Sequence, residues 1–199
     1  MDFTFSRNAS ITATILLIAA VTQAAYTAMY VAEITPPRQL LWGAEGLLFA
    51  MMAAFAGAAL AQAKSLHVGW SAIVGAAILN VVQVGVGLTM FGPFREVAEA
   101  APETAPLAGS IVAFSFMVYN AAKVLLALAA IVFGLAKMNA GGKALGGLTV
   151  AIGAIAFISN TLSMALGRGF TEIPVAGGSG VLATILLAVC LFGASREEG

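Results

Sequence analysis

LAGSIVAFSFMVYNAAKVLLALAAIVFGLA, the stretch from Leu107 to Ala136, decides the fold of this chain. Lys123 is its only charged residue, and most of the others are Ala, Leu, Val, Ile and Phe. A helix needs about 20 mostly apolar residues to cross the hydrocarbon core of a bilayer. This stretch is therefore long enough to form a membrane-spanning helix.

Apolar runs of similar character lie on both sides of it. Breaks rich in Pro and Gly separate them, such as Pro36-Pro37 and Gly141-Gly142. The pattern predicts an all-α fold, a polytopic membrane helix bundle with about six transmembrane helices. It also predicts that residues 1–199 form a single integral membrane domain. The expected helices span about residues 11–32, 40–63, 69–91, 107–136, 144–167 and 177–194.

A short similarity hints at an internal repeat. Phe94-Arg95-Glu96-Val97 resembles Phe170-Thr171-Glu172-Ile173, and each segment follows an odd-numbered helix of the prediction. The sequence thus leaves open a weak repeat of helical hairpins, and transporters are often built from repeats.

The composition excludes several classes of function. Apolar residues make up 61% of the chain and charged residues 9%, whereas a soluble domain usually carries about 25% charged residues. The formal net charge is zero, so no nucleic-acid partner is expected. One histidine, His67, and one cysteine, Cys190, are too few ligands for a bis-histidine haem or a metal cluster, and we expect no cofactor and no metal.

Lys and Arg residues indicate how the bundle is oriented, because cytoplasmic loops carry an excess of them. The first apolar run is longer than the roughly 7–15 apolar residues of a signal peptide, so we expect it to remain as a helix. Both termini are then predicted to be cytoplasmic, in the inner membrane if the cell is bacterial. The N-terminal side holds Arg7, Lys64, Lys137, Lys143 and Arg196, and the far side holds Arg38, Arg95 and Arg168.

Two other features concern the ends and faces of the helices. The acidic loop from Gly92 to Pro106 fits either a short helix at the membrane surface or a solvated loop. Gly146, Gly147 and Gly153 predict close packing of the fifth helix. Trp70, near a helix start, is interpreted as an interfacial anchor.

Lys123 is the most informative residue inside the predicted membrane segments. A lysine at the bilayer centre costs about 2.5–3.5 kcal/mol on insertion scales and usually faces a bundle interior or a wet cavity. Tyr119 and Asn120 precede it by four and three residues, so all three share one helix face. We therefore favour an internal role for Lys123 over a side chain that reaches to the membrane surface.

Glu45 is the other charge inside a predicted span, near the outer end of the second helix. Flanking Gly43 and Gly46 would let another helix approach. A pair between Glu45 and Lys123, direct or through water, would lower the free-energy cost of burying both charges. The alternative is that Glu45 is exposed at the interface.

Uncharged polar residues gather at a similar depth, between the midplane and the acidic side, while the cytoplasmic halves are almost purely apolar. This asymmetry predicts a pocket in the non-cytoplasmic half. The alternative is that these groups join helices by hydrogen bonds worth about 0.6 kcal/mol each. The candidate ligand-binding residues are Lys123, Asn120, Tyr119, Glu45, Asn80, Gln83, Asn160 and Gln23.

Three functional hypotheses follow from these residues. The first is a small carrier, channel or binding protein for a small polar or anionic solute. The second is a non-catalytic subunit or scaffold, with a membrane protein partner or a second copy of the chain. The third is an enzyme acting on a lipid or quinone, but no catalytic motif supports it. In each case the lipid bilayer is an expected partner.

Cysteine labelling tests the predicted orientation. A membrane-impermeant maleimide added to intact cells should label Glu99→Cys, which lies in the outer loop. It should not label Lys143→Cys until the membrane is permeabilised, because Lys143 lies on the predicted cytoplasmic side. The opposite labelling pattern would show that the orientation is inverted.

Overall fold

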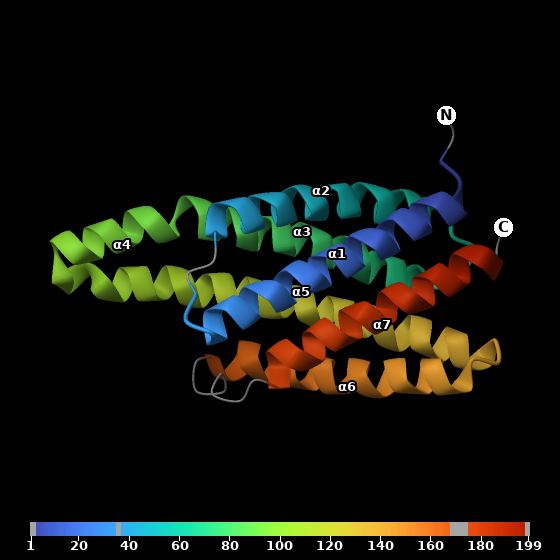
Figure 1. Cartoon of the computed structure of the whole chain (residues 1–199). Coiled ribbons are helices and arrows are strands. Elements are labelled where there is room, and N and C mark those ends of the chain that lie inside the picture. Colours follow the sequence, from blue (N-terminus) through green and yellow to red (C-terminus); the bar gives the residue numbers. More distant parts are fainter. Residues whose placement is uncertain (1–2, 35–36, 168–174, 198–199) are drawn as a thin grey trace.

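The structure is a computed structural model that describes residues 3–34, 37–167 and 175–197, and these are helical apart from short turns (Figure 1). The all-α prediction is confirmed. The segment Phe170–Ile173 lies outside the described residues, so the hairpin repeat stays a prediction. The elements are α1 (Phe5–Val31), α2 (Arg38–Gln62), α3 (His67–Thr89), α4 (Phe91–Ala100), η1 (Pro102–Thr104), α5 (Ala105–Asn139), α6 (Lys143–Leu166) and α7 (Val175–Glu197).

Six segments of the described chain are long and apolar enough to cross a membrane. Their order and positions agree with the predicted helices. The main difference is α1, which begins at Phe5 rather than near Ile11. The polar residues Ser6, Arg7 and Asn8 lie in the first turn of this helix.

The distribution of side chains identifies a membrane protein. Large apolar side chains such as Leu47, Phe116 and Ile158 are exposed on the outside of the bundle, while Lys123 and Asn160 are buried inside it. Contiguous exposed apolar surface of this kind suits a lipid environment, and polar side chains in membrane helices face the protein interior. The chain is therefore a multi-pass membrane helix bundle.

The spanning helices form a closed ring. Each packs against the next in the order α1, α2, α3, α5, α6 and α7, and α7 packs back against α1. An additional contact joins α5 and α7. In the part of the chain that the structure describes, the backbone of α5 does not pack against α1 or α2. Any link between these helices must therefore be made by side chains that cross the interior.

The α4 helix and the start of α5 form an arm that projects beyond the ends of the other helices (Figure 1). At about 1.5 Å per residue, the 35 residues of α5 exceed the ~30 Å hydrocarbon core. The prediction that this segment forms a short helix is confirmed, and the alternative of a loop is wrong. Its position at the membrane surface stays a prediction. The helix packs alongside α5, because Met90 keeps a right-handed helical conformation between α3 and α4.

Glycines bring α5 and α6 into close contact. A Cβ atom on Gly146 would lie 2.5 Å from the carbonyl oxygen of Gly134 and 2.7 Å from the backbone nitrogen of Met138. Gly153 is also close to the α5 backbone, 3.2 Å from the carbonyl oxygen of Ala127. Gly147 has open space around it. The predicted glycine contact is correct for Gly146 and Gly153 and wrong for Gly147, since neighbouring helix residues point about 100° apart.

Trp70 is buried, so its interpretation as an interfacial anchor is wrong. It is 1% exposed, and its ring meets Phe5 and Phe133 edge to face, with ring centres 5.7 and 5.3 Å away. The adjacent Gly69 leaves room for the Phe133 ring. Trp70 is thus a core residue at the end of the bundle where α1 begins.

Two leucine substitutions on adjacent residues test this packing. Gly146→Leu should lower the free energy of unfolding by about 1–3 kcal/mol or more, because the new side chain meets backbone atoms of α5. Gly147→Leu, the matched control, should leave stability near that of the parent. Thermal unfolding in detergent measures both. Equal losses in the two variants would contradict the α5–α6 contact.

Candidate functional site

Lys123 lies at the centre of the candidate site. It belongs to α5 and is 1% exposed. Its ammonium donates a hydrogen bond to Gln23 Oε1 of α1 at 2.6 Å and lies 5.3 Å from the centre of the Tyr119 ring. Because the described backbones of α1 and α5 do not pack against each other, this bond is made by two long side chains that reach across the bundle. The prediction of an internal Lys123 is confirmed.

Glu45 is the second buried charge. It belongs to α2, is 6% exposed, and its Oε1 accepts a hydrogen bond from the Thr22 hydroxyl at 2.5 Å. Gly46 lies against Val84 of α3, which brings the two helices together here, whereas Gly43 faces open space. The alternative of an exposed interfacial Glu45 is wrong.

Glu45 and Lys123 do not form a direct ion pair, so the direct form of the pair expected from the sequence is wrong. The only ion pair among the described residues joins Arg95 and Glu99 on the surface of α4, at 2.7 Å. Instead, consecutive residues of α1 hold the two charges, with Thr22 bound to the carboxylate and Gln23 to the ammonium. The opposite charges still attract each other across the remaining distance.

Asn160 of α6 lies close to Lys123, because both side chains contact the same glycine of α7. A Cβ atom on Gly180 would be 3.3 Å from Lys123 Cδ and 3.7 Å from Asn160 Nδ2, so both side chains lie against this glycine. Asn160 Nδ2 donates to the carbonyl oxygens of Ala156 and Ala176, at 2.8 and 3.2 Å. Its Oδ1 is buried and has no hydrogen-bond partner among the residues that the structure describes. A buried acceptor without a partner is unusual and can receive a donor from a bound molecule.

The structure therefore gathers five of the eight predicted residues and adds a sixth, Thr22. We call this group the Lys123 cluster. It contains an ammonium, a carboxylate, a phenol, a hydroxyl and two amides, drawn from α1, α2, α5 and α6. Its members are Lys123, Gln23, Thr22, Glu45, Tyr119 and Asn160.

The other three predicted residues are not joined to the Lys123 cluster by any hydrogen bond among the described residues. Gln83 donates to the Ser115 hydroxyl at 3.4 Å and so links α3 to α5. Asn80 donates to the carbonyl oxygen of Ala76 in its own helix, and its buried Oδ1 has no hydrogen-bond partner in the described part of the chain. Asn120 is buried, 7% exposed, on the helix that carries Lys123. Gln83 thus matches the alternative of a group that joins helices.

A second buried polar group lies near the start of α1. The half of the bundle that the sequence predicted to be almost purely apolar therefore holds polar side chains as well. Asn8 Nδ2 donates to Gln62 Oε1 of α2 at 2.9 Å. Gln62 Nε2 and Asn8 Nδ2 both donate to the carbonyl oxygen of Phe3, at 2.8 and 3.4 Å. These bonds fasten the start of the chain to α2. The prediction missed them because it began the first helix after Asn8.

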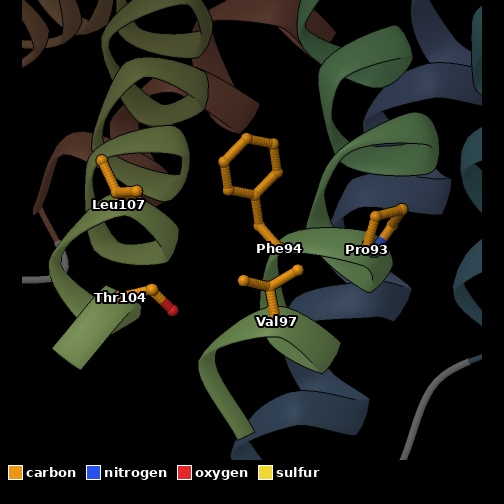
Figure 2. Close-up of a pocket in the computed structure, with 5 residues that line it drawn as sticks. All are labelled: Pro93, Phe94, Val97, Thr104 and Leu107. Atoms are coloured by element: carbon orange, nitrogen blue, oxygen red, sulfur yellow. The ribbon is translucent and has the colours of Figure 1, made fainter. Parts of the chain in front are cut away.

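Figure 2 shows a pocket on the arm, away from the Lys123 cluster. It has a volume of about 120 Å³ and lies between α4 and α5, with largely apolar walls. Leu107 is about 24 Å from Lys123 along α5, at about 1.5 Å per residue. This pocket is therefore not the predicted polar one. Its lining residues are Pro93, Phe94, Val97, Thr104 and Leu107.

Within the described residues, no group of three or more His, Cys, Asp or Glu side chains is arranged to hold a metal ion. Comparison of the chain with family models, with curated proteins and with solved structures gives no match. The Lys123 cluster is accordingly the feature that indicates a function.

A double-mutant cycle tests whether Glu45 and Lys123 interact. Glu45→Gln and Lys123→Met should each be destabilising, because each leaves one buried charge uncompensated. Together they should cost about 1–3 kcal/mol less than the sum of the single losses. Thermal unfolding in detergent gives the three values.

The exposed pair Glu96→Gln and Lys143→Met is the matched control for this cycle. These residues lie at opposite ends of the molecule, so their effects should simply add. Additive losses for Glu45 and Lys123 would mean that the two charges do not stabilise each other.

Proposed function

We propose that this protein is a small membrane carrier, channel or binding protein for a small anionic solute, with Lys123 as the binding residue. One observation carries the proposal. The Lys123 ammonium is fully buried in a membrane helix bundle, and its nearest partners are a neutral amide and an aromatic ring. Glu45 balances this charge only from a distance, so an anion bound at Lys123 would be its first direct partner of opposite charge.

The chemistry of the Lys123 cluster suits such a solute. A lysine ammonium has three hydrogen-bond donors, and one of them is directed to Gln23. The remaining donors are available to a carboxylate or an inorganic anion. The unpartnered Oδ1 of Asn160 would accept a hydrogen bond from a hydroxyl or amine on the same solute. A small carboxylate that also carries a hydrogen-bond donor therefore fits this site well.

The solute would enter from the side on which α4 projects, which we assign to the non-cytoplasmic face. The excess of Lys and Arg on the side where α1 and α6 begin favours cytoplasmic termini in an inner membrane. On the far side, Arg38 lies over the rings of Trp42 and Phe91, at 5.2 and 5.7 Å from their centres. Arg38 is about 10 Å outward of Glu45 along α2. Its exposed positive charge would attract an anion toward the bundle.

The arm favours a second candidate function, that of a non-catalytic subunit in a larger membrane complex. A helical projection with exposed Val97 and Leu107 offers apolar surface beyond the spanning helices. Purification from the native membrane distinguishes the two: a stoichiometric protein partner supports the subunit function, and a protein that binds anions alone supports the first.

Anion binding to purified protein tests the proposal. Acetate, glycolate, nitrate and sulfate serve as probes in calorimetry and thermal-shift measurements. Lys123→Met should weaken the binding of the best probe by about 30-fold or more, which corresponds to ~2 kcal/mol or more for a buried charge partner. Glycolate should bind more tightly than acetate if Asn160 accepts its hydroxyl.

Lys143→Met is the matched control, since it removes an exposed lysine at the start of α6. This variant should bind the probes as the parent does. The proposal fails if no probe binds the parent, or if Lys123→Met and Lys143→Met bind equally well.

A further inference from the structure

We propose that the Lys123 cluster binds one monovalent anion together with one proton, and that Glu45 receives the proton. This inference rests on the proposed function and adds to it the charge of the solute and the ion that accompanies it. It is carried by the charge balance of the buried residues and by the hydrogen bonds of Thr22.

The buried charges balance each other when the site is empty. Among the buried side chains that the structure describes, Glu45 and Lys123 are the only ones that carry a charge. The others are neutral amides and hydroxyls. One negative and one positive charge give an interior with no net charge, and a low-dielectric interior strongly favours that state.

An anion at Lys123 would disturb this balance. The interior would then hold two negative charges and one positive charge, and the excess would be costly in a membrane. Protonation of Glu45 restores neutrality. In the loaded state the anion balances Lys123, and Glu45 is a neutral acid.

Few other groups are available to take that proton. On α1, Thr22 faces Glu45, and Tyr26 lies further out, against the ring of Trp42. The only titratable residue of α3, His67, begins that helix at the opposite end of the bundle. The α5 helix contributes Lys123 and Tyr119. On α2 itself the other charge is Arg38, about two turns outward. Glu45 is the one carboxyl among these groups.

The hydrogen bonds of Thr22 suit both protonation states of Glu45. The Thr22 hydroxyl lies 2.5 Å from Glu45 Oε1 and 3.0 Å from the carbonyl oxygen of Ala19. With an ionised Glu45, the hydroxyl donates to the carboxylate. With a protonated Glu45, the acid donates to Thr22 Oγ1, and Thr22 turns its own hydrogen toward Ala19. No partner is lost in either state.

The separation of Glu45 from Lys123 also favours the binding of an anion. Because Gln23 rather than Glu45 holds the Lys123 ammonium, an arriving anion does not have to break an ion pair. The same balance selects the charge of the solute. A single proton on Glu45 compensates one negative charge, so a divalent anion would leave an excess. Nitrate, acetate and glycolate should therefore bind more tightly than sulfate.

The direction of the pH dependence follows from linkage. Binding takes up a proton where Glu45 is ionised in the empty protein and protonated in the loaded one. The affinity should then fall by about tenfold for each unit of rising pH within that range. Nitrate is the most direct probe, because it stays fully ionised and cannot itself carry the proton.

Proton uptake measured together with nitrate binding tests the inference. Calorimetry in two buffers of different ionisation enthalpy counts the protons taken up per anion bound. The parent and the exposed-carboxylate control Glu96→Gln should each take up about one. Glu45→Gln should take up none, and at about pH 7 it should bind nitrate more tightly than the parent, because no carboxylate repels the anion.

Each outcome bears on a different claim. If nitrate, acetate, glycolate and sulfate all fail to bind the parent, the proposed function fails and this inference fails with it. If only sulfate binds, the inference alone fails. If an anion binds the parent without proton uptake, only the inference fails. Uptake that persists in Glu45→Gln would overturn the assignment to Glu45. The count for the parent stands even if Glu45→Gln does not fold.

Discussion

The rest of this structure depends on the low dielectric of the membrane interior, in which polar groups must find their partners within the protein. Regular helices satisfy the backbone, which explains why the described chain is helical almost throughout. Charged side chains are harder to satisfy. The bundle holds two of them, and each is tied to α1 by a hydrogen bond between side chains. The ring of helices is the scaffold that holds those two part-buried bonds in place.

The first helix has an unusual share of these interactions. Thr22 bonds Glu45, and Gln23 bonds Lys123. Near the start of the same helix, Asn8 bonds Gln62 of α2. Packing against both α2 and α7, α1 also closes the ring. Glycines have the complementary role where helices meet without polar contacts, as Gly146 does against α5. Polar bonds thus join α1 to its neighbour α2 and, at Lys123, cross the interior to α5, while close backbone packing joins α5 and α6.

The sequence predicts the spanning helices well, because long apolar runs have few other stable structures in a cell. It also identifies Lys123 and Glu45, since charges stand out in such runs. It fails where the answer depends on how a helix is rotated against its neighbours. Gly147 and Gly146 look alike in sequence, yet only Gly146 meets another backbone. Thr22 was missed because a threonine in a helix usually bonds its own backbone. Trp70 was wrongly interpreted as an interfacial anchor, because its burial depends on the room that Gly69 leaves for Phe133.

The arm has a practical consequence for imaging. A 20.1 kDa membrane protein offers little mass outside the detergent micelle by which particles can be aligned. Here α4 and α5 leave the bundle as a helical pair joined by the short turn around Pro102. A rigid protein inserted at that turn through continuous helices would be held in a fixed orientation. Since α5 continues without a break from the arm to Lys123, such a marker would report directly on movements of the helix that carries the candidate site.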